Sequence, residues 1–67
     1  MVNLKKLRLN AGLTQEQLAL HCGVQRTTIT MIENGENNPS FDLALRLVKV
    51  LGCTMDNLVG DDNVTNS

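Results

Sequence analysis

This 67-residue sequence holds three Cys and His side chains, the residue types that most often bind zinc or pair as nucleophile and base: His21, Cys22 and Cys53. A zinc site needs about four such ligands at short, defined spacings. Adjacent helical positions point about 100° apart, so His21 and Cys22 cannot act together on one substrate. One disulfide is possible, but secreted domains of this size usually carry several. We therefore expect both cysteines to be small core residues in a reducing cytoplasm, with no enzyme activity, metal or other cofactor.

A second group of side chains has the chemistry to contact DNA bases. Its members lie on one side of a predicted helix, opposite the apolar side: Gln25, Arg26, Thr27, Thr30 and Met31. Arg26 is the strongest candidate, because a guanidinium pairs bidentately with the two guanine acceptors in the major groove. A phosphate contact or a solvated surface cation is the alternative for Arg26. Thr27 could reach a base or a phosphate, whereas Met31 offers only apolar contact, to a thymine methyl group or at the edge of an interface.

The composition limits the chain to one small domain. A chain of this length buries only roughly 60% of the surface that it exposes when unfolded, which leaves no room for a cleft between subdomains. Eleven leucines against a single aromatic side chain favour a helical core. No apolar stretch approaches the ~20 residues that span a bilayer, and no basic-then-apolar signal segment opens the chain. We therefore expect neither a membrane protein nor a secreted one.

Helix start and stop signals predict an all-α, compact five-helix bundle over residues 1–60, followed by a disordered polar tail over residues 61–67. The predicted order is a helix over about residues 3–10, a second between Thr14 and Gly23, a third over about 25–34, a fourth between Ser40 and Gly52, and a short fifth after Thr54. In the first helix the apolar spacing indicates a buried stripe of Leu4, Leu7 and Ala11.

The predicted fourth helix is apolar around most of its circumference. It carries two stripes, the first made of Phe41, Ala44, Val48 and Leu51 and the second of Leu43, Leu47 and Val50. Such a helix is buried on several sides, and a core this small covers about half of it. We expect the second stripe, together with Val59, to form the contact between two copies of the chain. The alternative is that some of these leucines belong to the core, and for Leu47 the core is the favoured place.

The second and third predicted helices, joined by a tight turn that contains glycine, form a helix-turn-helix arrangement. Motifs across the chain resemble the Cro/repressor (Xre-type) DNA-binding family, at residues 13–19, 23–24, 28–29, 32–35 and 38–40. The resemblance extends from about Leu4 to Leu58. It implies a lambda-repressor-like fold and a homodimeric transcriptional regulator on a palindromic double-stranded operator. A repressor is the favoured role and an activator is the alternative, because the role depends on where the site lies relative to a promoter.

The resemblance also assigns roles to individual residues. The helix at about residues 25–34 would be the recognition helix in the major groove. Gln15, Thr28 and Asn34 match positions that contact DNA phosphates in the family, and for Asn34 a purely structural helix end is equally compatible. Arg8 and Glu33 match a structural ion pair between the first helix and the end of the third. A half-buried charge needs such a partner.

The acidic net charge of −1 argues at first against DNA binding, because affinity depends on neutralising phosphates. The charges are unevenly distributed, however. Residues 1–34 contain four cationic and two anionic side chains, a net charge of +2. Residues 35–67 contain two cationic and five anionic side chains, a net charge of −3. The positive charge therefore accompanies the helix-turn-helix. We expect modest nonspecific affinity and a dependence on dimerisation and base contacts.

One rival hypothesis keeps the fold and changes the partner. The same module serves as an antitoxin that regulates its own operon, or as a protein-interaction domain without a DNA target. A toxin-binding antitoxin usually needs an additional segment or a large free surface. No sensor domain is apparent, so we expect no small-molecule ligand.

Overall fold

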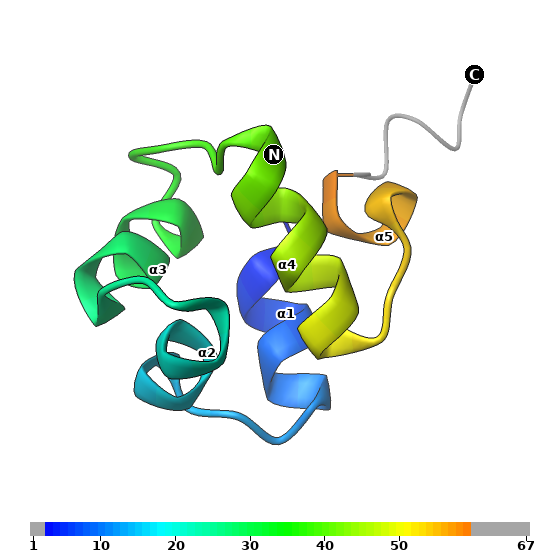
Figure 1. Ribbon diagram of the computed structural model, residues 1–67, viewed down its shortest axis with the longest axis horizontal. Helices are drawn as coiled ribbons and strands as arrows, with labels where there is room; N and C mark the ends of the chain where they lie inside the picture. The colour runs from blue at the N-terminus through cyan, green and yellow to red at the C-terminus, as the bar shows by residue number, and fades with distance from the viewer. Residues whose placement is uncertain (1–2, 60–67) are drawn as a thin grey trace.

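The computed structural model describes residues 3–59, and in that range the chain forms α-helices and no strand. The helices are α1 (Leu4–Asn10), α2 (Gln15–Cys22), α3 (Arg26–Glu33), α4 (Phe41–Leu51) and α5 (Met55–Val59). They pack into a compact bundle in which α2 and α3 lie together on one side and α5 lies on the other (Figure 1). The predicted all-α, five-helix fold is confirmed. The predicted polar tail lies outside the described residues.

The helix boundaries follow from capping side chains. Thr14 accepts a hydrogen bond from the Gln17 backbone N–H at 3.0 Å, and the Gln17 side chain accepts one from the Thr14 N–H at 2.9 Å. This is the predicted capping box, which satisfies two otherwise unpaired donors. Gly23 ends α2 with φ of 72°, a left-handed conformation that glycine adopts without a Cβ clash. The turn between α2 and α3 is therefore tight enough to hold the two helices against each other.

The core draws on every helix. The largest fully buried side chains come one from each, in chain order Leu4, Leu18, Ile29, Leu47 and Leu58. Because no helix has its own core, loss of any one of them exposes the others. Cys22 belongs to this core, and burial raises the pKa of its thiol while the positive charge of Arg46 lowers it in part. Cys53 is only half-buried, so the prediction that both cysteines lie in the core is wrong for Cys53.

The buried sides of α1 and α4 differ from the predicted ones. Ala11 is exposed, because α1 ends at Asn10 and the chain turns away there. In α4 the buried residues are Leu43, Ala44 and Leu47, so the core side draws on both predicted stripes. Leu43 and Leu47 are buried, and the prediction that they lie on a surface between two copies is therefore wrong. Phe41, predicted to be buried, is 72% exposed.

None of the helices in residues 3–59 is long and apolar enough to cross a membrane.

Candidate nucleic-acid interface

The side of α3 that faces away from the core is polar. Ile29 and Ile32 anchor the helix in the core, while the side chains of Gln25, Arg26, Thr27 and Met31 are exposed and Thr30 is half-buried. Gln25 is the residue that precedes the first turn, in extended conformation. We call the surface made by Gln25, Arg26, Thr27, Thr30 and Met31 the α3 ridge. The predicted base-contacting residues thus lie together, on one helix and mostly accessible.

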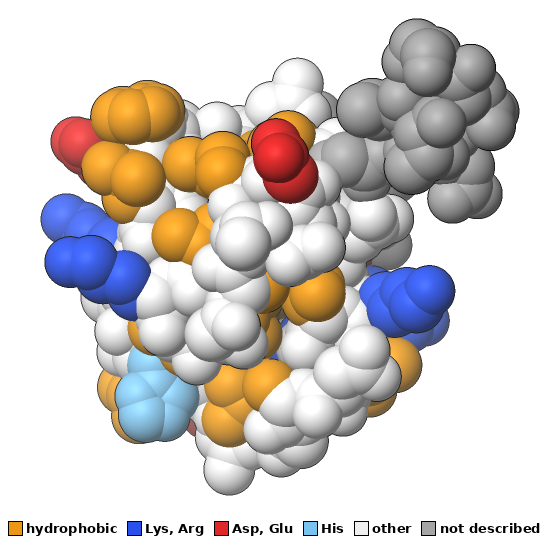
Figure 2. Space-filling view, turned by 90° about the vertical axis from the view of Figure 1, so that its right-hand side faces the viewer, with side chains coloured by type: hydrophobic (Ala, Val, Ile, Leu, Met, Phe, Trp, Pro, Cys, Tyr) orange, Lys and Arg blue, Asp and Glu red, His pale blue; other side chains and the backbone are white. Residues whose placement is uncertain are grey.

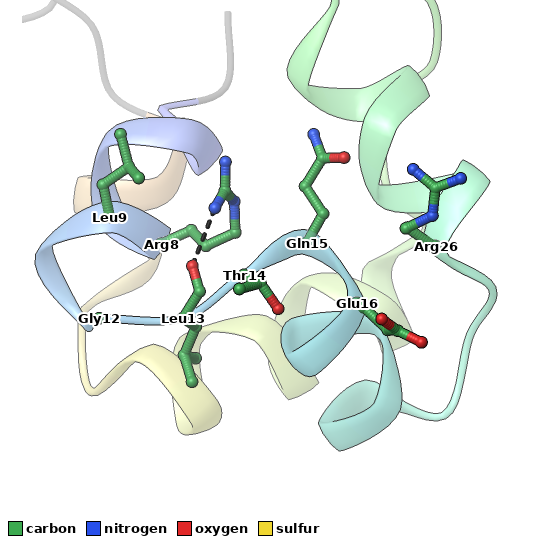
Figure 3. Close-up of a pocket in the computed structure, with 8 residues that line it drawn as sticks. All are labelled: Arg8, Leu9, Gly12, Leu13, Thr14, Gln15, Glu16 and Arg26. Carbon is green, nitrogen blue, oxygen red and sulfur yellow. Dashed lines mark hydrogen bonds between the residues drawn. The ribbon is translucent and has the colours of Figure 1, made fainter.

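A hollow of about 680 Å³ lies beside the α3 ridge, between the α1–α2 turn and the start of α3. Figure 3 shows Arg8 and Leu9 of α1 on one side of it and Arg26 of α3 on the other, with Gln15 at the start of α2 between them. Thr14 and Glu16 also line it. The start of α2 supplies free backbone N–H groups and the positive end of the helix dipole, which favour an anion. Glu16 adds a negative charge to the same place and opposes that preference.

A buried ion pair joins α1 to the end of α3. Arg8 donates from Nε to Glu33 Oε2 at 2.6 Å and from Nη2 to Glu33 Oε1 at 3.2 Å, with side chains only 9% and 3% exposed. The remaining terminal nitrogen, Nη1, donates to the Leu13 carbonyl at 2.8 Å (Figure 3). The pair implied by the family resemblance is therefore present, and it also fixes the turn that leads into α2. Within residues 3–59 no buried side-chain nitrogen or oxygen lacks a hydrogen-bond partner.

The ion pair is extended toward the α3 ridge by two further hydrogen bonds. Gln15 donates from Nε2 to Glu33 Oε1 at 2.9 Å, and the Thr30 hydroxyl donates to Gln15 Oε1 at 2.9 Å. Gln15 is therefore held by side chains of α3 as well as lying at the start of α2. Nothing in the sequence signals the Gln15–Thr30 contact, because fifteen residues and a turn separate the two positions.

The hydrogen-bonding and charged partners of Glu33 keep its carboxyl group ionised. Burial by itself raises the pKa of this carboxyl group, but the hydrogen bonds from Arg8 and Gln15, with the positive charges of Arg8 and Lys5, outweigh burial. The pKa of Glu33 is consequently lowered from its ordinary value of 4.5, and the side chain is ionised at neutral pH.

The other predicted contact residues lie around the ends of α3. Thr28 is half-buried in the first turn, and Asn34 is exposed at the residue that ends the helix. Met31 is held by the following loop, since its sulfur accepts from Asn37 Nδ2 at 3.6 Å and its carbonyl accepts from the Glu36 N–H at 2.9 Å. Met31 therefore presents a fixed apolar edge to the α3 ridge.

A different, apolar surface lies on α4 and α5. Phe41 is 72% exposed and Leu45 is 40% exposed on one side of α4, and Val59 of α5 is 46% exposed. Hydrophobic side chains are visible on the face that carries these two helices (Figure 2), and in Figure 1 α5 ends at the same end of the molecule at which α4 begins. We call Phe41, Leu45 and Val59 the α4–α5 patch. Val50, predicted to belong to the contact between copies, is half-buried.

The described residues hold no group of three or more His, Cys, Asp or Glu side chains that could bind a metal ion.

Comparison with known proteins is consistent with this geometry. A helix-turn-helix family model matches residues 4–58. An uncharacterized HTH-type transcriptional regulator from Archaeoglobus fulgidus is 38% identical over 55 residues, covering 82% of this chain and 79% of that protein. The control protein C.BamHI from Bacillus amyloliquefaciens is 33% identical over 63 residues, covering 92% and 78%.

A solved structure extends the similarity to three dimensions. The crystal structure of the restriction-modification controller protein C.AhdI from Aeromonas hydrophila matches with a TM-score of 0.75 at 33% identity, covering 81% of this chain and 82% of that one. Sequence, fold and the exposed polar side of α3 agree, and the chain belongs to the Cro/repressor-type helix-turn-helix family of DNA-binding transcriptional regulators.

Proposed function

We propose that the chain binds a specific double-stranded DNA sequence as a homodimer and represses transcription from it. The observation that carries this proposal is the α3 ridge: a polar, accessible helix side next to the start of α2, held from behind by Ile29 and Ile32. In this family arrangement the second helix of the motif enters the major groove, where side chains near its N-terminus contact base edges. Recognition would be carried by α3 and by the Gln25 position before it.

The residues divide by the part of DNA that they would contact. Arg26 would donate to guanine O6 and N7, and Met31 would contact a thymine methyl group. Gln25, Thr27 and Thr30 would contact neighbouring base edges. Phosphate contacts would come from Gln15, Thr28 and Asn34.

A homodimer would give this small module enough contact with DNA. Two copies related by a two-fold axis read half-sites about one helical turn, ~34 Å, apart, so the operator would be palindromic. The α4–α5 patch supports this arrangement, because it is apolar and accessible and lies on helices other than α3. It replaces the patch predicted from the sequence, of which Leu43 and Leu47 are buried.

DNA binding is tested by fluorescence-anisotropy titration against the region upstream of the chain's own gene and against sites selected from random DNA. We expect salt-sensitive binding that is lost in the double variant Arg26→Ala with Gln15→Ala. A reporter gene under the control of the bound site should show reduced transcription when the native chain is present. Failure to bind any DNA would reject the proposal and favour a protein-interaction module, such as an antitoxin, on the same fold.

Dimerisation is tested by analytical ultracentrifugation at tens of micromolar. Leu45→Asp should shift the native dimer to monomer, because a charge in a symmetric apolar contact is repeated in both copies. Leu20→Asp is the matched control, since Leu20 is an exposed leucine on α2, outside the patch. A native chain that sediments as a monomer would reject the homodimer.

A further inference from the structure

The hydrogen bonds that link α1 to the α3 ridge all point toward Glu33. Arg8 carries donors only, and it donates twice to Glu33. Glu33 is ionised at neutral pH and carries acceptors only. Any side chain that bonds to Glu33 must therefore donate to it. The buried pair thus sets the direction of every further bond in the series.

Gln15 transmits this direction because its amide has two unlike ends. A carboxylate cannot donate, so the amino end of Gln15 must face Glu33, and the observed Nε2–Oε1 distance is 2.9 Å. The carbonyl end then faces Thr30, where it accepts from the hydroxyl at 2.9 Å. The reversed amide would place two acceptors against each other at Glu33. The orientation of Gln15 is thus determined by the chemistry of its neighbour.

Thr30 is the last member of the series and has a single hydroxyl hydrogen. Two acceptors lie within reach of it on the protein side, Gln15 Oε1 at 2.9 Å and the Arg26 carbonyl at 3.1 Å. Whichever of them takes the hydrogen, the bond points into the protein. Oxygen lone pairs remain for a partner outside, and Thr30 is half-buried, so part of its side chain is accessible.

We propose that Thr30 is an acceptor-only contact that selects a base presenting an exocyclic amino group, adenine N6 or cytosine N4, over the carbonyl oxygens of guanine and thymine. In the major groove adenine and cytosine present these amino donors, whereas guanine O6 and thymine O4 are acceptors. A threonine with a free hydroxyl would accept or donate and would not discriminate in this way. The inference rests on the proposed function, in which the α3 ridge lies in the major groove.

The direction of the series is tested first without DNA, by NMR of the chain at neutral pH. Overhauser contacts from the Gln15 side-chain amino protons to the Glu33 side chain, and not to the Thr30 methyl group, are expected. The opposite pattern would overturn the inference whatever the chain binds.

The base preference is tested on a site selected from random DNA by the native chain. The base pair that Thr30 contacts is identified as the position at which sequence preference changes in Thr30→Val, a variant of similar shape without a hydroxyl. Every base pair carries one amino base and one carbonyl base, so the preferred pair alone does not show which group Thr30 contacts, and the base analogues below make that assignment. We expect Thr30→Ser to retain the preference. An unchanged preference in Thr30→Val would overturn the inference.

Base analogues then isolate the amino group. Purine in place of adenine, or 2-pyrimidinone in place of cytosine, removes only the exocyclic amine. The native chain should lose roughly 3- to 10-fold in affinity, the effect of one hydrogen bond, and Thr30→Val should lose none beyond the change in the duplex itself. Equal losses in both would overturn the inference while leaving DNA binding intact. Absence of any DNA binding by the native chain would instead reject the proposed function, and the base preference with it.

Discussion

The helices α3 and α4 both turn apolar side chains to the core, and they differ in what they leave outside. Around buried Ile29 and Ile32, α3 exposes a cation and hydrogen-bonding groups. Around buried Leu47, α4 exposes Phe41 and Leu45 as well as the charged side chains of Asp42, Arg46 and Lys49. The outward side of α3 suits a hydrated, anionic partner, whereas the Phe41–Leu45 edge of α4 suits another apolar surface. The buried side chains of each helix therefore stabilise the fold, and its exposed side chains indicate which kind of partner the helix can bind.

The largest expected effect separates the two sides of α4. Leu47→Ala should lower the free energy of unfolding by about 2–5 kcal/mol, because it leaves a cavity at a fully buried position. Leu45→Ala, the same change on the outward side, should lower it by less than about 0.5 kcal/mol in dilute solution. Urea unfolding followed by circular dichroism measures both. Comparable losses would contradict the division of α4 into a core side and a surface side.

The next effect tests the outward side of α3. Arg26→Ala should weaken binding to a selected site roughly 10- to 100-fold, the value of a bidentate contact to guanine. Lys49→Ala removes the same charge from α4 and serves as the control, with a small change expected. Anisotropy titrations at fixed salt give the ratio. Similar losses in the two variants would mean that Arg26 supplies charge alone.

A smaller effect concerns how stability depends on pH through the Arg8–Glu33 ion pair between α1 and α3. Because the folded-state pKa of Glu33 is lowered, its contribution to stability is fully present above its ordinary pKa of 4.5 and is lost as the pH falls through the folded value. The native chain should therefore lose stability below about pH 4.5. Glu33→Gln should begin less stable at pH 7 and show a shallower acid decline. Thermal melts at a series of pH values measure this, and parallel declines would contradict it.

The smallest expected effect concerns the hollow beside the α3 ridge. Glu16→Gln should raise DNA affinity by roughly 2- to 5-fold at low salt, because it removes a negative charge facing the phosphates. Asp56→Asn removes an exposed charge from α5, on the other side of the molecule, and should have less effect. A salt titration of both variants measures the difference. Equal gains would indicate that net charge alone sets the affinity.

The sequence predicted α3 better than α4, for a physical reason. In α3 apolar and polar side chains alternate at helical spacing, so Ile29 and Ile32 identify the inward side without ambiguity. In α4 the apolar residues cover most of the circumference, so spacing alone could not place the core side. The predicted stripes consequently put Phe41 inside and Leu43 outside, and the structure reverses both.

The candidate site was predictable where local signals exist. The position of Gln15 followed from the Thr14 capping box, and that of Arg26 from the start of α3. The links from Gln15 to Glu33 and Thr30 depend on how two helices cross, and no local pattern encodes that crossing. The direction of those hydrogen bonds emerges only from the assembled fold.

The first and last described segments of the chain are joined directly. The Asn3 N–H donates to the Leu58 carbonyl at 2.8 Å, and Asn3 Nδ2 donates to the Asn57 carbonyl at 3.3 Å. A circular permutant that bridges these segments with a short linker, and opens the chain in the exposed loop between α3 and α4, would keep every helix whole. A segment fused directly before Asn3 or after Val59, by contrast, would leave the bundle beside the α4–α5 patch and crowd the region where we propose that the second copy binds.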